Sequence, residues 1–271
     1  MNRVCKMPLT RRPKLGQHFL REARFIRLID EAVLLDADGL LVEIGPGGGE
    51  MTRRLAARAH RLVAIELDPE FATTLKSEFQ GNPRVEVLCA DILKTDISAL
   101  CSRHGAERCF VFGNLPYYIT SPILLHLFAA RSSIRRMALL MQREVAERVT
   151  ASPGSKNYAS LSVLAQCDSE PHIVFTVPPG AFSPPPKVYS ALVDFRMTPR
   201  FPEWDVSTHR EFLAFVQKCF AQKRKNLLNN LGAVYSRARV LTALQAAGLE
   251  PPPRAEQLGL EQFARLFLLL R

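Results

Sequence analysis

The sequence predicts an α/β protein in which a doubly wound, mainly parallel sheet with an antiparallel closing strand is followed by a small C-terminal helical domain. In the first half of the chain, short apolar runs alternate with helix-like stretches, and a glycine-rich turn follows the first complete run. Beyond the last apolar run, the pattern is helical alone. A chain of 271 residues with 47% hydrophobic content is long enough to bury a sizeable core.

The expected parallel strands are apolar runs that contain several β-branched residues. They cover residues 40–44, 61–67, 84–90, 108–112 and 137–142. Helix-like stretches at 49–59 and 69–79 lie between the first of these runs, and strands alternating with helices at this spacing indicate βαβ units.

Two later runs, 172–177 and 190–197, are joined by the proline-rich segment 'PPGAFSPPPKVY'. That segment is too short and too rich in proline to contain a crossover helix, so the two runs are expected to pair antiparallel and close the sheet. The expected helices of the second domain cover residues 209–231, 237–248 and 260–270. We therefore place the domain boundary near Thr198, between a domain at 1–198 and a helical domain at 199–271.

The charge of the chain favours a polyanionic partner. Thirty-six Lys and Arg residues against 26 Asp and Glu give a net charge of +10, and the segment 218–239 is basic without any acidic residue. Such clustering is typical of a surface that binds nucleic acid, although a solvated helix face is the alternative. No apolar run approaches the roughly 18 residues that span a bilayer, so no membrane partner is expected.

The six cysteines show no C-x-x-C pair and no histidine spaced to complete a metal site. They are expected to be reduced thiols in a cytoplasmic protein that binds no metal. The protein is also expected to be monomeric. The N-terminal stretch 'MNRVCKMPLTRRPK' is basic and free of acidic residues, as transit peptides are, but it lacks an apolar core. A targeting role is therefore the less favoured alternative.

The stretch 'VEIGPGGGE' places Gly45, Gly47 and Gly49 directly after the first strand of the sheet. A dinucleotide-binding turn would need glycine where this chain has Glu50, so the pattern indicates a different nucleotide-like ligand. The glycines permit a tight turn and a close approach of the backbone to that ligand. A glycine-rich turn without a ligand is the alternative.

Polar residues end the next three strands at the edge where open α/β sheets bind ligands. Glu66 is placed to accept hydrogen bonds from both hydroxyls of a ribose, and Asp91 is placed for an adenine amino group. Asn114 ends the fourth strand and opens 'NLPY'. Each residue alone is more often a helix cap, but together with the glycine turn they favour a binding site.

The tetrad 'NLPY' combines an amide acceptor, a proline and the ring of Tyr117. An amide acceptor beside an aromatic face is suited to hold a flat, amine-bearing ring such as a nucleobase. The alternative is an ordinary turn, because strands often end in Asn and Pro.

The ordered set of motifs 'GQHFL', 'VEIGPGGGEMT', 'IELDPE', 'ADIL', 'GNLPYYITSPIL', 'SPGSKNYASLSVLAQ', 'VPPGAFSPPPKVYSALV' and 'FAQKRKNLLNNL' spans nearly the whole chain. It resembles the S-adenosylmethionine-dependent adenine-N6 methyltransferases of ribosomal RNA, most closely the small-subunit dimethyladenosine transferases. The resemblance implies a Rossmann-like class I methyltransferase fold. Its implied cofactor contacts are His18, Leu20, Gly45, Gly47, Glu66, Asp91 and Asn114. The family commonly has Asn at the positions of His18 and Tyr118, and we expect Tyr118 to tune packing.

The resemblance also implies how the tetrad works. The Asn114 amide oxygen, with the carbonyl of Leu115 or Pro116, would accept the two N6 hydrogens of an adenine and free the nitrogen lone pair. Tyr117 would stack on the extruded base. Phe182 would cover the opposite face of the base, with ordinary core packing as an equal alternative.

The implied substrate is a pair of adjacent adenines in a loop near the 3′ end of small-subunit rRNA, modified during maturation of the small ribosomal subunit. Basic residues expected to contact RNA are Arg11, Arg12, Lys14, Lys218, Lys223, Arg224 and Lys225. Large-subunit methyltransferases share the tetrad, but 'SPGSKNYASLSVLAQ' and 'FSPPPKV' favour the small-subunit type. A noncatalytic RNA-binding factor for transcription or assembly is the alternative of another class.

Overall fold

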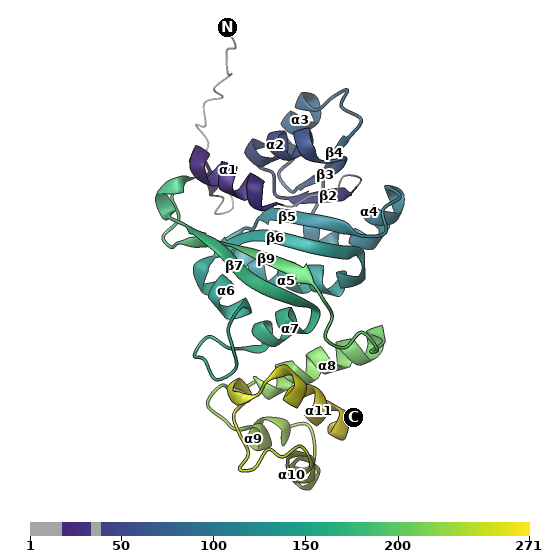
Figure 1. Ribbon diagram of the computed structural model, residues 1–271, viewed down its shortest axis with the longest axis vertical. Coiled ribbons are helices and arrows are strands. Elements are labelled where there is room, and N and C mark those ends of the chain that lie inside the picture. The colour runs from purple at the N-terminus through teal and green to yellow at the C-terminus, as the bar shows by residue number, and fades with distance from the viewer. Residues whose placement is uncertain (1–17, 34–38) are drawn as a thin grey trace.

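A computed structural model describes residues 18–33 and 39–271 of the chain. The basic residues Arg11, Arg12 and Lys14 lie outside the described residues. Figure 1 shows an α/β part built around one large sheet and a helical part at the end of the molecule that contains the C-terminus.

The large sheet has seven strands in the order β4-β3-β2-β5-β6-β9-β7. Its strands are β2 (Leu40–Ile44), β3 (Arg61–Glu66), β4 (Val85–Cys89), β5 (Cys109–Asn114), β6 (Ile134–Gln142), β7 (Ser169–Val177) and β9 (Ser190–Met197). The strands from β4 to β6 pair in parallel, and β9 runs antiparallel to both β6 and β7. The predicted antiparallel pair is thus confirmed, with β9 inside the sheet and β7 at its edge.

Helices cover both faces of this sheet (Figure 1). One face packs against α1 (Ala23–Ala32), α2 (Glu50–Arg58) and α3 (Pro69–Glu78). The other packs against α4 (Ile97–Arg103), α5 (Thr120–Ala129), α6 (Arg143–Val149) and α7 (Ser160–Asp168). Because both faces are covered, the parallel strands are apolar along their length, which is why they appear in the sequence as short continuous runs.

A second, two-stranded sheet was not expected from the sequence. The strands β1 (Phe19–Leu20) and β8 (Phe182–Ser183) pair antiparallel, with Leu20 opposite Phe182. The Arg21 and Glu22 amides both donate to the carbonyl of Ala181 and continue the contact. This pairing carries the start of the described chain to the edge of the large sheet, beside the end of β5.

The helical part contains α8 (Val206–Cys219), α9 (Leu227–Leu231), α10 (Arg237–Ala246) and α11 (Leu260–Leu270). The single helix expected over residues 209–231 is therefore wrong, because the chain turns between α8 and α9. The buried Asn230 amide donates to the carbonyls of Cys219 and Gln222, and Asn226 caps α9 by accepting from the Asn229 amide. These bonds satisfy backbone groups that a continuous helix would have paired itself.

The helical part does not pack as an isolated unit. Its core, which includes Phe212, Leu231 and Phe263, also contains Tyr158, just before α7, and Val163 and Cys167 of α7. Because the two parts share this core, the expected boundary near Thr198 marks a change in the kind of structure along the chain. That the parts are separate domains stays a prediction. Short 3₁₀ turns complete the elements, at Ile92–Lys94, Tyr117–Ile119, Arg131–Ser133, Pro179–Ala181 and Ala255–Gln257.

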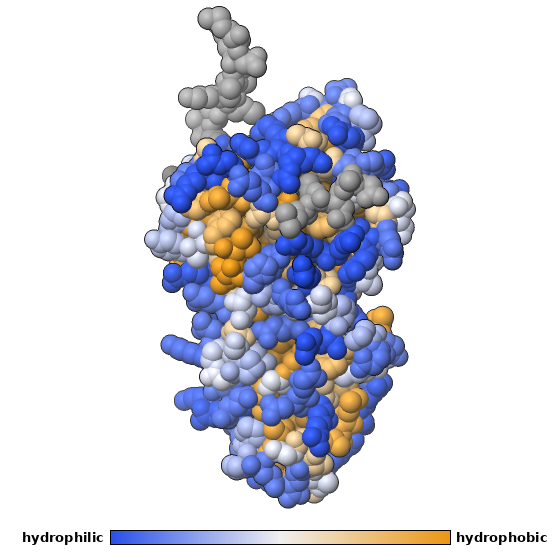
Figure 2. All heavy atoms as spheres, viewed as in Figure 1, coloured by the Kyte–Doolittle hydropathy of each residue, from blue (hydrophilic) through white to orange (hydrophobic). Residues whose placement is uncertain are grey.

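The visible face of the molecule is mainly hydrophilic, with hydrophobic residues interspersed over both parts (Figure 2). Within residues 18–33 and 39–271, no helix is both long and apolar enough to cross a membrane.

Candidate active site

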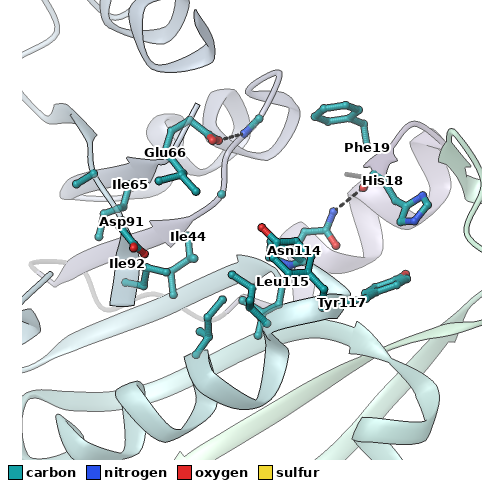
Figure 3. A pocket seen from close by; sticks show the side chains of 18 residues that line it. His18, Phe19, Ile44, Ile65, Glu66, Asp91, Ile92, Asn114, Leu115 and Tyr117 are labelled. Atoms are coloured by element: carbon teal, nitrogen blue, oxygen red, sulfur yellow. Dashed lines mark hydrogen bonds between the residues drawn. The ribbon is translucent and has the colours of Figure 1, made fainter. Parts of the chain in front are cut away.

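A pocket opens at the carboxyl ends of the parallel strands, where the sequence analysis places the ligand. It is lined by Gly45 and Gly47 after β2, Glu66 at the end of β3, Asp91 after β4 and Asn114 at the end of β5. Figure 3 shows the side chains of Glu66, Asp91 and Asn114 around the pocket at neighbouring strand ends. The four strand ends converge because consecutive parallel strands present the same end to one edge of the sheet.

The turn after β2 requires glycine at Gly47. Its φ of +53° lies in the left-handed region, and a Cβ there would lie 2.7 Å from the Phe19 ring. Gly45 and Gly49 have positive φ as well, at 65° and 79°. The turn therefore brings bare backbone to the pocket wall, as close approach to a ligand requires.

Glu66 is held by the backbone around it. Its two carboxylate oxygens accept hydrogen bonds from the amides of Gly47 and Asp68, each at 2.9 Å. Figure 3 shows the first of these bonds. Burial raises the pKa of Glu66, and these two amide bonds oppose the rise. Each oxygen keeps a second lone pair, so the carboxylate can still accept from a pair of ligand hydroxyls.

Asp91 follows β4 in a half-buried position. One of its oxygens, Oδ1, accepts from the Leu93 amide at 3.0 Å and caps the 3₁₀ turn that follows. Asp91 is thus both a cap and a pocket residue, and its second oxygen remains available to a ligand amino group.

The Asn114 amide is oriented by the main chain of a residue far away in the sequence. Its Nδ2 donates to the carbonyl oxygen of His18 at 3.0 Å (Figure 3). This bond uses the nitrogen side of the amide, so Oδ1 is the atom left to accept a hydrogen bond from a ligand. His18 therefore acts on Asn114 through its backbone, while its ring Nδ1 lies 2.8 Å from the carbonyl oxygen of Pro184.

The two carbonyls proposed as the second acceptor are not equivalent. The Pro116 oxygen already accepts from the Ile119 amide at 3.2 Å and from the Thr120 hydroxyl at 3.1 Å. The Leu115 oxygen accepts from no residue in the part of the chain that the structure describes. Leu115 is therefore the better candidate for the second acceptor.

Tyr117 lines the same pocket and its ring is held in place. Its hydroxyl hydrogen-bonds the buried Ser190 hydroxyl at the start of β9, and its ring lies 5.3 Å from the His18 ring, centroid to centroid. Burial raises the pKa of Tyr117, so the phenol stays protonated at neutral pH. A neutral ring fixed at both ends suits stacking on a base.

Two other predicted site residues lie in the core. Leu20 and Phe182 are 6% and 4% exposed, face each other across β1 and β8, and pack beneath α1 and α2. Neither lines the pocket described above. Their roles at the cofactor and the target base remain predictions.

The predicted RNA-binding residues of the helical part are exposed. Lys218 lies in the last turn of α8, and Lys223, Arg224 and Lys225 lie in the turn between α8 and α9. Lys223 donates to the carbonyl of Lys156 at 3.0 Å, which ties this turn to the segment before α7.

Comparison with known proteins over nearly the whole chain identifies its family. A sequence model of the family "Ribosomal RNA adenine dimethylase" matches residues 9–271. The protein named Ribosomal RNA small subunit methyltransferase A of Acidobacterium capsulatum is 48% identical over 257 residues, which cover 94% of this chain and 90% of that protein. The chain belongs to the ribosomal RNA adenine dimethylase family.

Other members and solved structures agree with this assignment. The protein of the same name from Latilactobacillus sakei is 42% identical over 93% of this chain and 87% of its own. The crystal structure of the 23S rRNA methyltransferase ErmE has a TM-score of 0.71 and 31% identity, covering 93% of this chain and 99% of that one. A dimethyladenosine transferase from Plasmodium falciparum has a TM-score of 0.78 at 24% identity, covering 93% and 96%, and supports the fold.

The cofactor of this dimethylase family, S-adenosylmethionine, fits the residues of the pocket. The Glu66 carboxylate is suited to the ribose hydroxyls, Asp91 to the adenine amino group, and the Gly45–Gly47 backbone to close approach. Because the lining combines these polar groups with the apolar side chains of Ile44, Ile65 and Ile92, it can hold a nucleoside.

One buried acidic residue next to the site was assigned no role from the sequence. Glu43 lies within β2 and is 1% exposed, and its Oε2 has no hydrogen-bond partner among the described residues. Burial raises its pKa to about 8, an effect that Thr52 offsets in part and the neighbouring Glu66 increases. The signal in the sequence was a carboxylate inside an otherwise apolar strand.

The expectation for Tyr118 is wrong. Tyr118 is 56% exposed and lines the pocket rather than packing in a core.

Cys167 lies with Asp168 and His209 in a buried cluster whose potential ligand atoms are all within 4.8 Å of one another, which the spacing in the sequence did not indicate. Asp168 Oδ1 forms an ion pair with Arg131 and a hydrogen bond with His209 Nε2, so Asp168 and His209 are both used within the fold.

Proposed function

We propose that the protein transfers methyl groups from S-adenosylmethionine to N6 of two adjacent adenines in a loop near the 3′ end of small-subunit rRNA, giving N6,N6-dimethyladenosine. The observation that carries the proposal is the fixed Asn114 amide of the pocket, whose nitrogen donates to the His18 carbonyl and whose oxygen is left to accept from a ligand. The carbonyl of the next residue, Leu115, also accepts from no residue that the structure describes. The names of the relatives at 48% and 42% identity support small-subunit rRNA as substrate. Cytoplasmic location is part of this proposal, because it is where a substrate of this kind would be met.

The reaction needs a better nucleophile than free adenine offers, because the N6 lone pair is delocalised into the ring. Acceptors at Asn114 Oδ1 and the Leu115 carbonyl bind the two N6 hydrogens and favour a tetrahedral nitrogen with a localised lone pair. S-adenosylmethionine supplies an electrophilic methyl group on its sulfonium sulfur. Positioning of the base then accounts for a large part of the rate, on the order of 7–11 kcal/mol for well-oriented groups.

Tyr117 holds the target base in this geometry. A ring fixed by the Ser190 hydroxyl offers a flat surface to the extruded adenine, and stacking of this kind contributes about 1–3 kcal/mol per base. A base that is stacked or paired in RNA has to leave the stack to reach such a pocket, so an unpaired loop is the favoured target.

A filter assay of labelled methyl transfer tests the function. Small subunits that lack the modification, fully modified small subunits and large subunits are incubated with the protein and labelled S-adenosylmethionine. We expect label in the first substrate only, as N6,N6-dimethyladenosine at neighbouring positions. Transfer to large subunits instead would favour the activity in the name of ErmE, and absence of transfer to all three would favour a noncatalytic RNA-binding factor.

A further inference from the structure

A second polar surface borders the tetrad along the same edge of the sheet. The strand β6 ends at Gln142 opposite Ser190, the first residue of β9, because these two strands run antiparallel. The residues just outside this pair, Arg143 and Tyr189, are joined by a hydrogen bond from the Arg143 amide to the Tyr189 carbonyl at 2.9 Å. Since Ser190 also bonds the Tyr117 hydroxyl, the surface is directly connected to the tetrad.

This surface presents an exposed ring with cationic groups. Tyr189 is 48% exposed, and the Arg143 guanidinium lies over its ring at 5.6 Å from the centroid. Lys187, two residues earlier, is exposed and has no ion pair among the described residues. An aromatic platform combined with cations is the combination by which proteins bind single-stranded nucleic acid.

One acidic residue faces this surface. The Arg143 Nε lies 3.2 Å from a carboxylate oxygen of Glu147 one helical turn away, and the two side chains are 53% and 40% exposed. Exposed pairs of this kind contribute little to stability, and a guanidinium has further N–H groups to donate. Arg143 can therefore bind a phosphate without losing a contact that the fold needs.

The arrangement of the pocket decides what occupies this surface. The groups suited to the cofactor, Glu66 and Asp91, lie at the ends of β3 and β4, on one side of β5. The strands β6 and β9 lie on the other side of β5. When the cofactor is bound, its groups occupy the β3–β4 side of β5. The RNA that supplies a base to Asn114 therefore approaches from the β6–β9 side.

We propose that Tyr189, Arg143 and Lys187 bind the nucleotides that flank the target adenine. A neighbouring base stacks on the Tyr189 ring, and Arg143 and Lys187 bind the phosphates beside it. This inference rests on the proposed function for the identity of the substrate as RNA, but it concerns residues outside the pocket.

Binding of a short, labelled, single-stranded adenine-rich RNA to the full chain, measured by fluorescence anisotropy with S-adenosylhomocysteine present, tests the surface. Tyr189→Ala should weaken binding about 5- to 150-fold, whereas Tyr189→Phe, which keeps the ring, should bind within about twofold of the unaltered protein. Arg143→Ala should reduce the slope of log affinity against log salt by about 0.7, the value for one phosphate on a single strand. The main-chain bond between the two residues survives each substitution.

Arg103→Ala is the matched control. Like Arg143, Arg103 is about half exposed, at 51%, and pairs with one carboxylate. It lies at the end of α4, near the start of β5 and so at the edge of the sheet opposite the pocket. Its substitution should leave RNA affinity unchanged. Wild-type affinity in both Tyr189→Ala and Arg143→Ala would overturn the proposal, even if the filter assay shows methylation. Weakened binding in these variants without methylation of any subunit would support the surface and reject the proposed function.

Discussion

Asn114 combines two hydrogen-bonding roles in one side chain. Its nitrogen donates to the His18 carbonyl, and its oxygen is left to accept from the substrate proposed above. After one transfer an adenine keeps a single N6 hydrogen, so the second transfer has one acceptor bond fewer, worth about 0.5–1.5 kcal/mol. We therefore expect the second methylation to be slower than the first without being blocked.

Asn114→Ala should retain RNA binding and lose both transfers, roughly a hundredfold or more in kcat, since both the acceptor and the bond that positions it are removed. Mass spectrometry of nucleosides from treated small subunits measures the outcome. The unaltered protein should give mainly N6,N6-dimethyladenosine. Dimethylation at the normal rate by Asn114→Ala would show that the amide is not an essential acceptor.

Glu66 should determine affinity for the cofactor. Glu66→Ala removes a charged acceptor for the ribose and should cost roughly 1.5–3 kcal/mol, or about 10- to 150-fold in Kd for S-adenosylmethionine. Because the pKa of Glu66 is raised by burial, cofactor affinity of the unaltered protein should fall as the pH drops through that raised value. Calorimetry at several pH values measures both effects, and an unchanged Kd in Glu66→Ala would contradict the assignment.

Glu43 should make stability depend on pH in a definite direction. Its pKa rises from 4.5 to about 8 on folding, so between these values the folded protein binds a proton that the unfolded chain does not. The contribution of Glu43 to the free energy of unfolding is therefore complete below pH 4.5, and it is lost as the pH rises to about 8.

Glu43→Gln, which is neutral at every pH, should gain free energy of unfolding relative to the unaltered protein as pH rises through this window, by up to about 1.4 kcal/mol per pH unit. Urea unfolding of both proteins at pH 5 and pH 8 gives this difference, and other titrating groups cancel between them. A difference that does not vary with pH would mean that Glu43 is ionised in the folded state.

At the scale of elements, the turn between α8 and α9 places several positively charged residues together on the surface. An uninterrupted helix would have distributed them around its axis. Arg224 and Lys225 are exposed in this turn, whose backbone is fixed by the Asn230 amide. Arg239, by contrast, donates to the carbonyls of Leu270 and Arg271 and so holds the end of α11. The basic segment 218–239 is thus only partly available to RNA.

Arg224→Ala combined with Lys225→Ala should flatten the salt dependence of binding to small subunits by about 1.4–1.8 in the slope of log affinity against log salt, since each neutralised phosphate adds about 0.7–0.9. Cofactor affinity should not change, because the pocket is formed by other elements. The double variant of Arg84 and Arg103, two exposed arginines beside the starts of β4 and β5, is the control. An unaltered slope in the first variant would place the RNA elsewhere.

At the scale of the whole molecule, one buried carboxylate joins the two parts. Asp168 is 1% exposed, and its Oδ1 lies 2.8 Å from His209 Nε2 of α8 and 3.2 Å from Arg131 Nε of the sheet-bearing part. The linker after β9 adds bonds from the amides of Thr198 and Arg200 to the carbonyls of Asp168 and Cys167. The orientation of the helical part relative to the pocket therefore depends on this junction.

Asp168→Asn should destabilise the protein by about 3–5 kcal/mol, the usual cost of breaking a buried ion pair from one side. It should also speed limited proteolysis in the linker 199–205. Asp194→Asn, which breaks the comparable pair with Arg136 inside the sheet, should destabilise the protein without faster linker cleavage. Equal linker cleavage in the two variants would show that Asp168 does not secure the junction.

The sequence by itself determined the alternation of strands and helices, the glycine turn and the edge of the sheet that carries the site. These features depend on local patterns: short apolar runs form buried strands, and residues that follow parallel strands meet at one edge. Glu66, Asp91 and Asn114 could be placed together for this reason. The break between α8 and α9 could not be predicted within residues 209–231. It depends on hydrogen bonds from the Asn230 side chain to the carbonyls of Cys219 and Gln222, on the other side of the turn.

Only the tertiary structure decided which atoms of the site are free to act. The orientation of Asn114 depends on His18, 96 positions away, and the placement of Tyr117 depends on Ser190, 73 positions away. The junction at Asp168 depends on His209, 41 positions away. No local pattern encodes such contacts, since a hydrogen bond forms wherever folding brings donor and acceptor within about 3 Å, whatever their separation along the chain.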